Sequence, residues 1–358
     1  MKRIGLLTSG GDCQGLNAAL RGVAKAMYQW MPDAEIYGFR DGYQGLITSN
    51  YNMMKPGDFS GILTLGGTIL GTSRQPFKSI INRESENEPD KVEAMMDTYR
   101  KAGLDAMVIL GGNGTHKTAN LLRENGMRVV TLPKTIDNDV WGTDLTFGFQ
   151  SAMEIASNVI DYIHTTAMSH SRVFIIELMG HDAGWLTLYA GIAGGADVLL
   201  IPEIPYRLES VVQTVENRIA QGKNFSIIAL AEGSIDVKEA GLSKKDFKAK
   251  RASESYPSIG YRLAKELMDL TGRESRVTVP GHYQRGGPPC PADRVLATRL
   301  GSGAVRLIHK GDFGNMVGLV DNEIVAVPLE KVAGRLKLVP PDGSMVRCAK
   351  DIGVDFGD

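Results

Sequence analysis

The stretch Thr131-Leu-Pro-Lys-Thr-Ile-Asp-Asn-Asp139 joins the end of an apolar run to two closely spaced carboxylates. The run Arg128–Leu132 predicts a short buried strand that breaks at the following proline. In an α/β protein, residues just past the carboxyl end of such a strand face the ligand crevice. The two aspartates, with a lysine and a threonine upstream, form a set suited to phosphoryl transfer. The same composition is also typical of a turn that caps a helix, so both interpretations stay open here.

The composition indicates an α/β chain with more than one core. A chain of 358 residues, 43% hydrophobic and 23% charged, predicts two domains or one large α/β unit. Its 42 glycines fit a protein with many tight turns between strands and helices. A net charge of -1 gives no electrostatic reason to expect nucleic-acid binding.

The location of the protein is also indicated by its sequence. The N-terminus runs directly into a strand and lacks the apolar region of a signal peptide. No stretch approaches the roughly 20 apolar residues of a membrane span. The cysteines Cys13, Cys290 and Cys348 have no metal-binding spacing and suit a reducing compartment. We therefore expect a cytoplasmic protein with no membrane partner.

Glycine clusters punctuate the first half of the chain. Ser9-Gly-Gly-Asp12 follows a predicted strand, and Leu65–Arg74 mixes glycines with a cation. Gly111-Gly-Asn-Gly-Thr-His-Lys-Thr118 lies between a strand and a helix predicted over 118–124. Such turns present backbone N–H groups to an anion, so phosphate is the expected ligand. The last cluster is not a P-loop, because that motif requires glycine where His116 precedes the lysine.

The second half repeats the alternation of apolar runs and helices, which predicts a second parallel α/β domain. Its predicted strands cover 172–177, 197–201, 225–231 and 275–279. The stretch Gly281-His-Tyr-Gln-Arg-Gly-Gly287 then sets a histidine and an arginine beside glycines, which favours an anion site over a packed histidine.

Three further stretches are predicted to lie at the surface or the end of the fold. The charged residues 82–90 predict a solvated loop. The lysine-rich residues 236–254 predict an exposed helix or excursion. Beyond residue 314 we expect one more strand, over 316–319, and a short basic tail.

Taken in order and spacing, these motifs resemble those of the phosphofructokinase family. The motifs are Gly10–Asp12, Gly66–Gly71 with Arg74, Gly111–Thr115, Pro133–Asp139, Met179–Gly180, Glu232–Gly233 and Gly281–Gly287. The resemblance covers nearly the whole chain and implies two Rossmann-like doubly wound α/β domains with the active site in the cleft between them. It assigns 1–149 plus 271–310 to a phosphoryl-donor (ATP) binding domain. It assigns 150–270 plus 311–358 to a sugar-phosphate binding domain.

The resemblance also implies an activity, the transfer of a phosphoryl group from ATP to the 1-hydroxyl of fructose 6-phosphate. Asp137 would be the general base, and Thr135 would hydrogen-bond near the transferring group. Asp139 and Asn113 would hold Mg²⁺. The implied donor-binding residues are Gly11, Tyr43, Arg74, Gly112, Asn113, Gly114, Thr115 and Lys134. The implied substrate-binding residues are Thr135, Asp137, Asp139, Arg172, Met179, Gly180, His181, Glu232, Arg276, His282 and Arg285.

In this family, arginines matching Arg172 and Arg276 reach the sugar phosphate from a neighbouring subunit. The resemblance therefore implies a homo-oligomer, either a tetramer or a dimer. A site shared in this way would give substrate a route to cooperative binding.

Four positions bear on where the chain departs from the usual ATP-dependent pattern. Asn113 stands where an aspartate is usual near the metal, and His181 stands where an arginine is common. Gly114 is typical of ATP-dependent members because an aspartate there would exclude the α-phosphate. Lys134 is instead typical of members that use pyrophosphate. We predict ATP as the donor and keep pyrophosphate as the alternative.

Two other functions deserve comparison. NAD and lipid kinases share the Gly-Gly-Asp-Gly-Thr pattern near Gly111, but they lack the set Glu232, His282 and Arg285. A catalytically silent phosphate-binding regulator is the alternative of a different class, motivated by Asn113 and His181.

Overall fold

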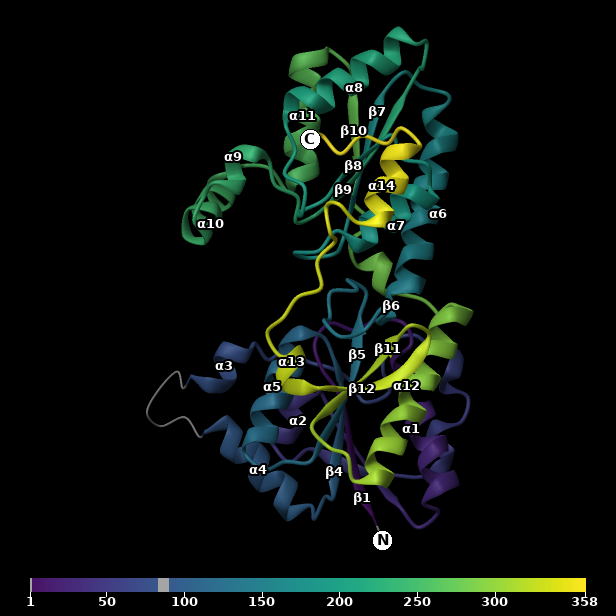
Figure 1. Cartoon of the computed structure of the whole chain (residues 1–358), viewed down its shortest axis with the longest axis vertical. Coiled ribbons are helices and arrows are strands. Elements are labelled where there is room, and N and C mark those ends of the chain that lie inside the picture. The colour runs from purple at the N-terminus through teal and green to yellow at the C-terminus, as the bar shows by residue number, and fades with distance from the viewer. Residues whose placement is uncertain (1, 83–89) are drawn as a thin grey trace. The chain divides into compact units, whose positions relative to one another are not determined.

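The computed structural model describes residues 2–82 and 90–358, so the charged loop predicted over 82–90 falls outside this range for all but its ends. The chain forms two compact units (Figure 1). The first comprises Met1–Ser151 and Arg285–Lys337, and the second comprises Ala152–Gln284 and Leu338–Asp358. Each unit holds parallel β-strands and helices, which confirms the predicted α/β fold class.

The first unit is built on a mixed sheet with the strand order β12-β11-β5-β4-β1-β2-β3. The five inner strands are parallel, and the two edge strands are antiparallel to their neighbours. A short strand β6 (Phe147–Gly148) extends the carboxyl end of β5. The strand bounds are β1 Arg3–Thr8, β2 Glu35–Phe39, β3 Tyr51–Met54, β4 Ala106–Gly111, β5 Val129–Thr135, β11 Asn315–Val320 and β12 Glu323–Pro328.

Helices cover both faces of this sheet. On one face α1 (Leu16–Trp30) lies against α12 (Pro291–Lys310), and on the other lie α2 (Tyr43–Ile47), α4 (Lys91–Lys101) and α5 (Asn113–Glu124) (Figure 1). Shorter elements of this unit are η1 Pro56–Phe59, η2 Ile62–Thr64, α3 Phe77–Ile81 and α13 Leu329–Val332. A Cβ atom on Gly301 of α12 would lie 2.7 Å from the carbonyl oxygen of Ala19, so glycine permits this close helix approach.

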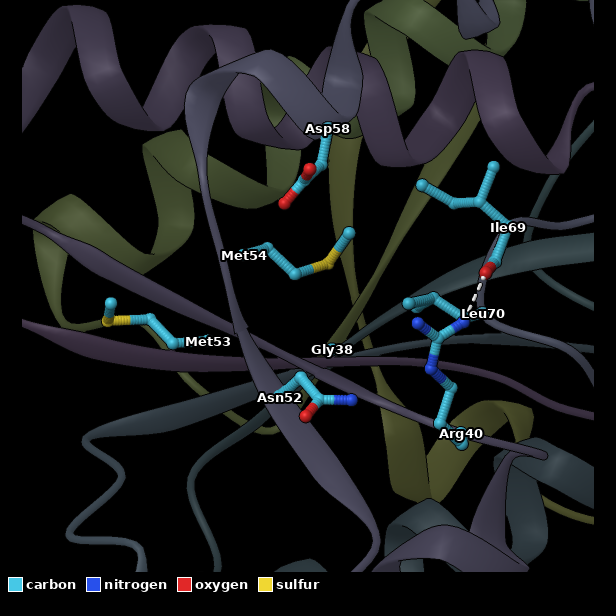
Figure 2. A pocket seen from close by; sticks show the side chains of 8 residues that line it. All are labelled: Gly38, Arg40, Asn52, Met53, Met54, Asp58, Ile69 and Leu70. Carbon is cyan, nitrogen blue, oxygen red and sulfur yellow. Dashed lines mark hydrogen bonds between the residues drawn. The ribbon is translucent and has the colours of Figure 1, made fainter.

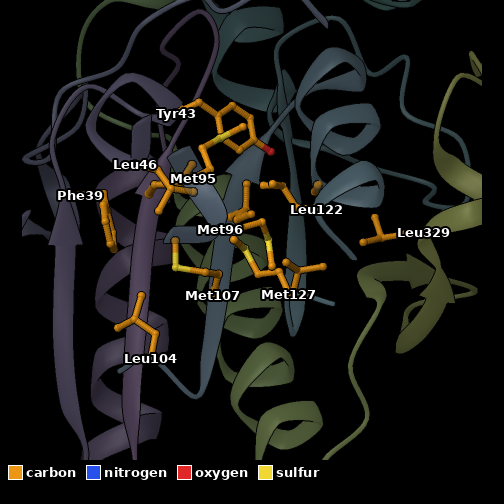
Figure 3. Close-up of a cluster of buried hydrophobic side chains, with 14 of the residues drawn as sticks. Phe39, Tyr43, Leu46, Met95, Met96, Leu104, Met107, Leu122, Met127 and Leu329 are labelled. Carbon is orange, nitrogen blue, oxygen red and sulfur yellow. The ribbon is translucent and has the colours of Figure 1, made fainter. Parts of the chain in front are cut away.

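The core beneath α2, α4 and α5 is rich in methionine, leucine and aromatic side chains (Figure 3). Its buried members include Phe39, Tyr43, Met95, Met107 and Leu122. Burying side chains of this size contributes roughly 1.5–3 kcal/mol each. This core fixes the helices whose ends flank the carboxyl edge of the sheet.

The second unit has a four-stranded parallel sheet with the order β10-β7-β9-β8. Its strands are β7 Val173–Leu178, β8 Val198–Leu200, β9 Ser226–Ala231 and β10 Ser275–Thr278. Its helices are α6 Phe149–Ala167, α7 Trp185–Ala193, α8 Leu208–Ala220, α9 Val237–Ala240, α10 Lys244–Ser253, α11 Ile259–Thr271 and α14 Ser344–Asp351. A short η3 spans Gly281–Arg285. The buried core includes Ile175, Leu200, Ile228, Leu230 and Leu263.

The domain limits differ from those expected. Residues 311–337 join the first unit, because β11 pairs with β5 and β12 pairs with β11. Residues 271–284 belong to the second unit, because β10 pairs with β7. The expected basic tail is therefore wrong, since it contains a strand and two helices.

Two local expectations are also corrected. β5 does not break at Pro133 but runs on to Thr135, because β6 continues the pairing at Lys134 and Thr135. Helix α5 begins at Asn113 instead of Thr118, so most of the glycine cluster forms its first turn. Among the described residues, no helix is both long enough and apolar enough to cross a membrane.

Candidate functional site

The loop after β5 holds its two leading residues in a reciprocal contact. The hydroxyl of Thr135 donates to Asp137 Oδ2 at 2.9 Å, and the backbone N–H of Asp137 donates to Thr135 Oγ1 at 3.1 Å. Asn138 follows with a φ of 51°, a left-handed conformation that separates Asp137 from Asp139. Both carboxylates are half-buried. The loop therefore presents two acids with different partners at the carboxyl edge of the sheet.

Helix α5 starts beside this loop with an uncapped first turn. Its N-cap residue is Gly112, and no side chain of the described chain caps it. The N–H groups of the first turn thus remain as donors for an anion, which the helix dipole also favours. A Cβ atom added to Gly114 would meet no heavy atom within 4 Å, so space is open at this position.

Cationic side chains gather around the turn after β1. The ammonium of Lys134 donates to the carbonyl oxygen of Gly11, and Arg285 Nη1 donates to the carbonyl of Asp12 at 3.0 Å. A Cβ atom on Gly11 would lie 3.1 Å from Arg285 Nη1 and 3.4 Å from Arg74 Nη2. Arg285 Nε is buried and has no hydrogen-bond partner among the described residues.

The α5 first turn reaches the same place. A Cβ atom on Gly10 would lie 3.5 Å from Lys134 Nζ and 3.9 Å from Thr115 Oγ1. Three cations and the start of a helix therefore surround one glycine turn, an arrangement suited to a polyphosphate.

Burial shapes the chemistry of this turn. Lys134 is only 3% exposed, and burial lowers its pKa, with Cys13 opposing that shift and Arg285 adding to it. Burial also raises the pKa of the Cys13 thiol to about 12, so Cys13 stays protonated and unreactive. In α5, burial lowers the pKa of His116 to about 3, which keeps the imidazole neutral. Lys134, Arg74 and Arg285 thus supply the positive charge.

Asn113 and Asp139, the predicted metal ligands, are in contact. The Asn113 amide donates to Asp139 Oδ2 at 3.0 Å and to the Asp139 carbonyl at 3.1 Å. Asn113 Oδ1 is buried with no hydrogen-bond partner among the described residues. One carboxylate and one such oxygen fit Mg²⁺, which keeps several waters and is completed by substrate phosphates. No group of three or more His, Cys, Asp or Glu suited to a metal occurs in residues 2–82 and 90–358.

Tyr43, predicted to bind the donor, lies inside the core of the first unit (Figure 3). Its hydroxyl donates to the carbonyl oxygen of Thr115 at 2.8 Å. In this position Tyr43 supports the first turn of α5 from within the core.

In the second unit, Glu232 follows β9 and contacts the turn after β7. Its Oε1 atom accepts hydrogen bonds from the backbone N–H groups of His181 at 2.9 Å and Gly180 at 3.3 Å. These two residues have φ values of 52° and 148°, which a sharp turn after Met179 requires. The His181 ring is exposed and lies 3.4 Å from Asp182, and His282 is exposed on η3. The structure thus joins Glu232 to the Met179–His181 turn.

Arg172 and Arg276 share one counter-ion that the sequence reading missed. Both guanidinium groups contact the carboxylate of Glu274, whose pKa the hydrogen bond from Arg172 lowers. The parallel pairing of β10 with β7 brings these arginines together. A carboxylate two positions before Arg276 was the only signal in the sequence.

A pocket of about 240 Å³ lies elsewhere in the first unit (Figure 2). Its lining residues are Gly38, Arg40, Asn52, Met53, Met54, Asp58, Ile69 and Leu70. Arg40 Nη1 donates to the Ile69 carbonyl at 2.8 Å across it. None of the predicted site residues lines this pocket.

The chain was then compared with known proteins. The sequence profile of the family described as Phosphofructokinase matches residues 3–308. The chain is 54% identical over 359 residues to the ATP-dependent 6-phosphofructokinase of Spirochaeta thermophila, covering 100% of this chain and 98% of the relative. It is 47% identical over 374 residues to that of Propionibacterium freudenreichii, covering 99% of each.

Solved structures give the same result. The phosphofructokinase of Pichia pastoris in the T-state matches with a TM-score of 0.80 and 32% identity, covering 92% of this chain and 35% of the yeast chain. The pyrophosphate-dependent phosphofructokinase of Marinobacter aquaeolei has a TM-score of 0.79 at 20% identity, covering 99% of this chain and 92% of its own, and shares the fold. The chain belongs to the phosphofructokinase family.

Proposed function

We propose that the chain is an ATP-dependent 6-phosphofructokinase, a phosphotransferase that acts on the 1-hydroxyl of D-fructose 6-phosphate in glycolysis. The observation that carries this proposal is the Thr135–Asp137 pair, set beside a glycine turn ringed by Lys134, Arg74 and Arg285. A base next to a polyphosphate site is what this transfer requires. The names of the relatives at 43–54% identity support the same assignment.

Asp137 would act as the general base. It takes the proton of the sugar 1-hydroxyl while that oxygen attacks the terminal phosphorus of ATP. The bond from this phosphorus to the bridging oxygen breaks, and ADP leaves. The hydroxyl of Thr135 orients the Asp137 carboxylate through their 2.9 Å hydrogen bond. A positioned base contributes about 10²- to 10⁴-fold to such a rate.

Residues of the first unit would stabilise the phosphates. The amides of Gly11 and of the first α5 turn, with Gly112, Gly114 and Thr115, donate to phosphate oxygens, while Arg74 and Lys134 supply charge. Asp139 and Asn113 would hold Mg²⁺, which neutralises charge on the phosphates when bound.

Residues of the second unit would bind the sugar phosphate. This set comprises Met179, Gly180, His181, Glu232 and His282, and Arg285 of the first unit would join it. We also propose a homo-oligomer in which Arg172 and Arg276 serve a neighbouring subunit's substrate.

Pyrophosphate is the second candidate donor, and Lys134 is the observation that favours it. We prefer ATP because the space at Gly114 leaves room for the α-phosphate. The test measures fructose 1,6-bisphosphate formation with ATP and with pyrophosphate at fixed Mg²⁺. Turnover with ATP is expected, and turnover with pyrophosphate alone would reject the ATP assignment.

A matched pair of variants tests the base. Asp137→Asn should lower kcat by about 10²- to 10⁴-fold while fructose 6-phosphate still binds. Asp182→Asn, at an exposed carboxylate of the second unit, serves as the control. Unchanged turnover in Asp137→Asn would contradict the role of Asp137.

A further inference from the structure

The segment Arg335–Lys337 runs alongside the loop that follows β5. Leu336 forms an antiparallel bridge with Val140, and the Lys337 backbone N–H donates to the Asp139 carbonyl at 2.8 Å. The Arg335 guanidinium lies 4.4 Å from the centre of the Trp141 ring. Three consecutive residues thus contact the loop in succession, through backbone and side chain.

The Lys337 ammonium makes the most extensive of these contacts. Its Nζ atom donates to Asn138 Oδ1 at 3.0 Å, to the Thr143 carbonyl at 2.9 Å and to the Asp144 carbonyl at 2.8 Å. An ammonium has three N–H donors, so this geometry uses all of them. Hydrogen bonds from a charged donor contribute about 1.5–3 kcal/mol each.

Asn138 is the residue through which this contact reaches the two acids. It lies between Asp137 and Asp139 in the left-handed conformation, which costs a non-glycine residue about 1–2 kcal/mol. Its Oδ1 atom also accepts from the Thr146 N–H at 3.1 Å, and its amide donates to the Asp144 carbonyl at 3.3 Å. The side chain of Asn138 is therefore fixed from several sides, with Lys337 supplying the only charged partner printed by its geometry among the described residues.

Lys337 comes from a part of the chain that the family profile does not match. The match ends at residue 308, whereas the brace stands 29 positions later. The loop that it contacts, in contrast, carries the most specific motif of the family. The chain thus adds its own support to a shared loop.

We propose that Lys337 is a positioning residue for phosphoryl transfer, which holds Asn138 and thereby sets the relative orientation of Asp137 and Asp139. This inference rests on the proposed function of the two acids. Lys337 itself does not touch the reacting atoms. Its loss should therefore lower the rate of transfer more than the binding of sugar phosphate.

The test compares Lys337→Met with Arg335→Met in the full-length chain. Met keeps the length of lysine but has no donors. Lys337→Met should lower kcat by about 10- to 100-fold, because a small misplacement of catalytic groups has an effect of this size. Its KM for fructose 6-phosphate should stay within about twofold of the original value. Arg335→Met removes only the contact with Trp141 and should leave kcat unchanged.

A double-mutant cycle tests whether Lys337 acts through Asn138. Glycine adopts the left-handed conformation without a side-chain contact, so Asn138→Gly removes the acceptor but permits the turn. Adding Lys337→Met to Asn138→Gly should lower kcat much less than it does alone. Additive effects, or a Lys337→Met kcat equal to that of the original chain, would overturn the inference.

Folding and the assigned activity are checked separately. Circular dichroism melts establish that each variant folds, and Lys337→Gln replaces Lys337→Met if the latter does not. Gln is uncharged and shorter, so the same loss of kcat is expected and an unchanged kcat again overturns the inference. If the original chain forms no fructose 1,6-bisphosphate, the proposed function has failed. If it is active and Lys337→Met is equally active, only the role of Lys337 has failed.

Discussion

The ammonium of Lys134 donates a hydrogen bond to the backbone carbonyl of Gly11, a residue 123 positions earlier in the chain. This contact joins the end of β5 to the turn after β1 and holds a buried cation beside an uncapped helix. It gives Lys134 a structural partner as well as a charge that faces the donor site. Its effect on donor choice is therefore measurable apart from its effect on folding.

Replacing Lys134 with methionine should weaken use of the phosphoryl donor. Loss of a charged donor contributes about 1.5–3 kcal/mol, so kcat/KM for the donor should fall about 10- to 100-fold. The fall should be larger with pyrophosphate, whose affinity depends on charge alone. Initial rates with both donors provide the measurement, and Lys101→Met at an exposed position of α4 is the control. Equal kcat/KM before and after the change would mean that Lys134 does not contact the donor.

Gly114→Asp should lower the use of ATP without harming the fold. The added Cβ meets no atom, and an acidic residue in a first helical turn stabilises the helix slightly. Repulsion between the new carboxylate and the α-phosphate should lower kcat/KM for ATP about 10-fold or more. Gly114→Asn is the matched control, because it adds the same volume without charge. ATP kinetics unaffected by the aspartate would place the nucleotide elsewhere.

Asn113→Asp should make stability depend on Mg²⁺. Without metal, a carboxylate replaces the amide that now donates to Asp139, so the contact becomes repulsive. We expect a loss of about 1–3 kcal/mol of unfolding free energy in a chelator, recovered when Mg²⁺ is added. Thermal melts with and without Mg²⁺ measure this, with Asn113→Ala as the neutral control. A midpoint that does not respond to Mg²⁺ would argue against a metal at this position.

Glu239→Gln should destabilise the second unit in a pH-dependent way. Glu239 is fully buried and, although burial would raise its pKa, hydrogen bonds from Arg262, Arg251 and Lys250 hold the pKa well below the usual range. A lowered folded pKa stabilises above the unfolded value of about 4.3, and the stabilisation is lost as pH falls through the folded pKa.

At pH 7 the variant should lose about 3–5 kcal/mol, because it leaves buried Arg262 without its charged partner. Below pH 4 the difference between variant and original should shrink. Urea denaturation across this pH range measures both effects, with exposed Glu209→Gln on α8 as the control. A constant difference at all pH values would show that the charge of Glu239 is not responsible.

Much of the fold follows from local pattern. The strands β1, β2 and β4 are short apolar runs bounded by glycine or polar residues, and their positions were predicted closely. The same holds for the order of the site motifs. Pattern failed at Pro133, because the strand passes through a residue that usually ends one. There the neighbouring strand β4 ends at Gly111, so the missing N–H falls at the last position of the ladder.

Contacts between distant segments account for the rest. Glu274 lies near Arg172 only because β10 pairs with β7, and Lys337 meets Asn138 only because the chain returns after β12. Neither pairing has a local signature, since each depends on which strands become neighbours. The antiparallel strand β12 escaped prediction for the same reason: its partner β11 gives it a place in the sheet.

The edge formed by β11 and β12 sets a lower limit on how far this protein can be shortened. A fragment that stopped at residue 308 would contain every family motif named above. It would nevertheless leave β5 as an unprotected margin, with bare amides and carbonyls along the strand that leads to Asp137. Such a fragment would be prone to self-association through that strand. The smallest working unit therefore extends well past the last recognisable motif.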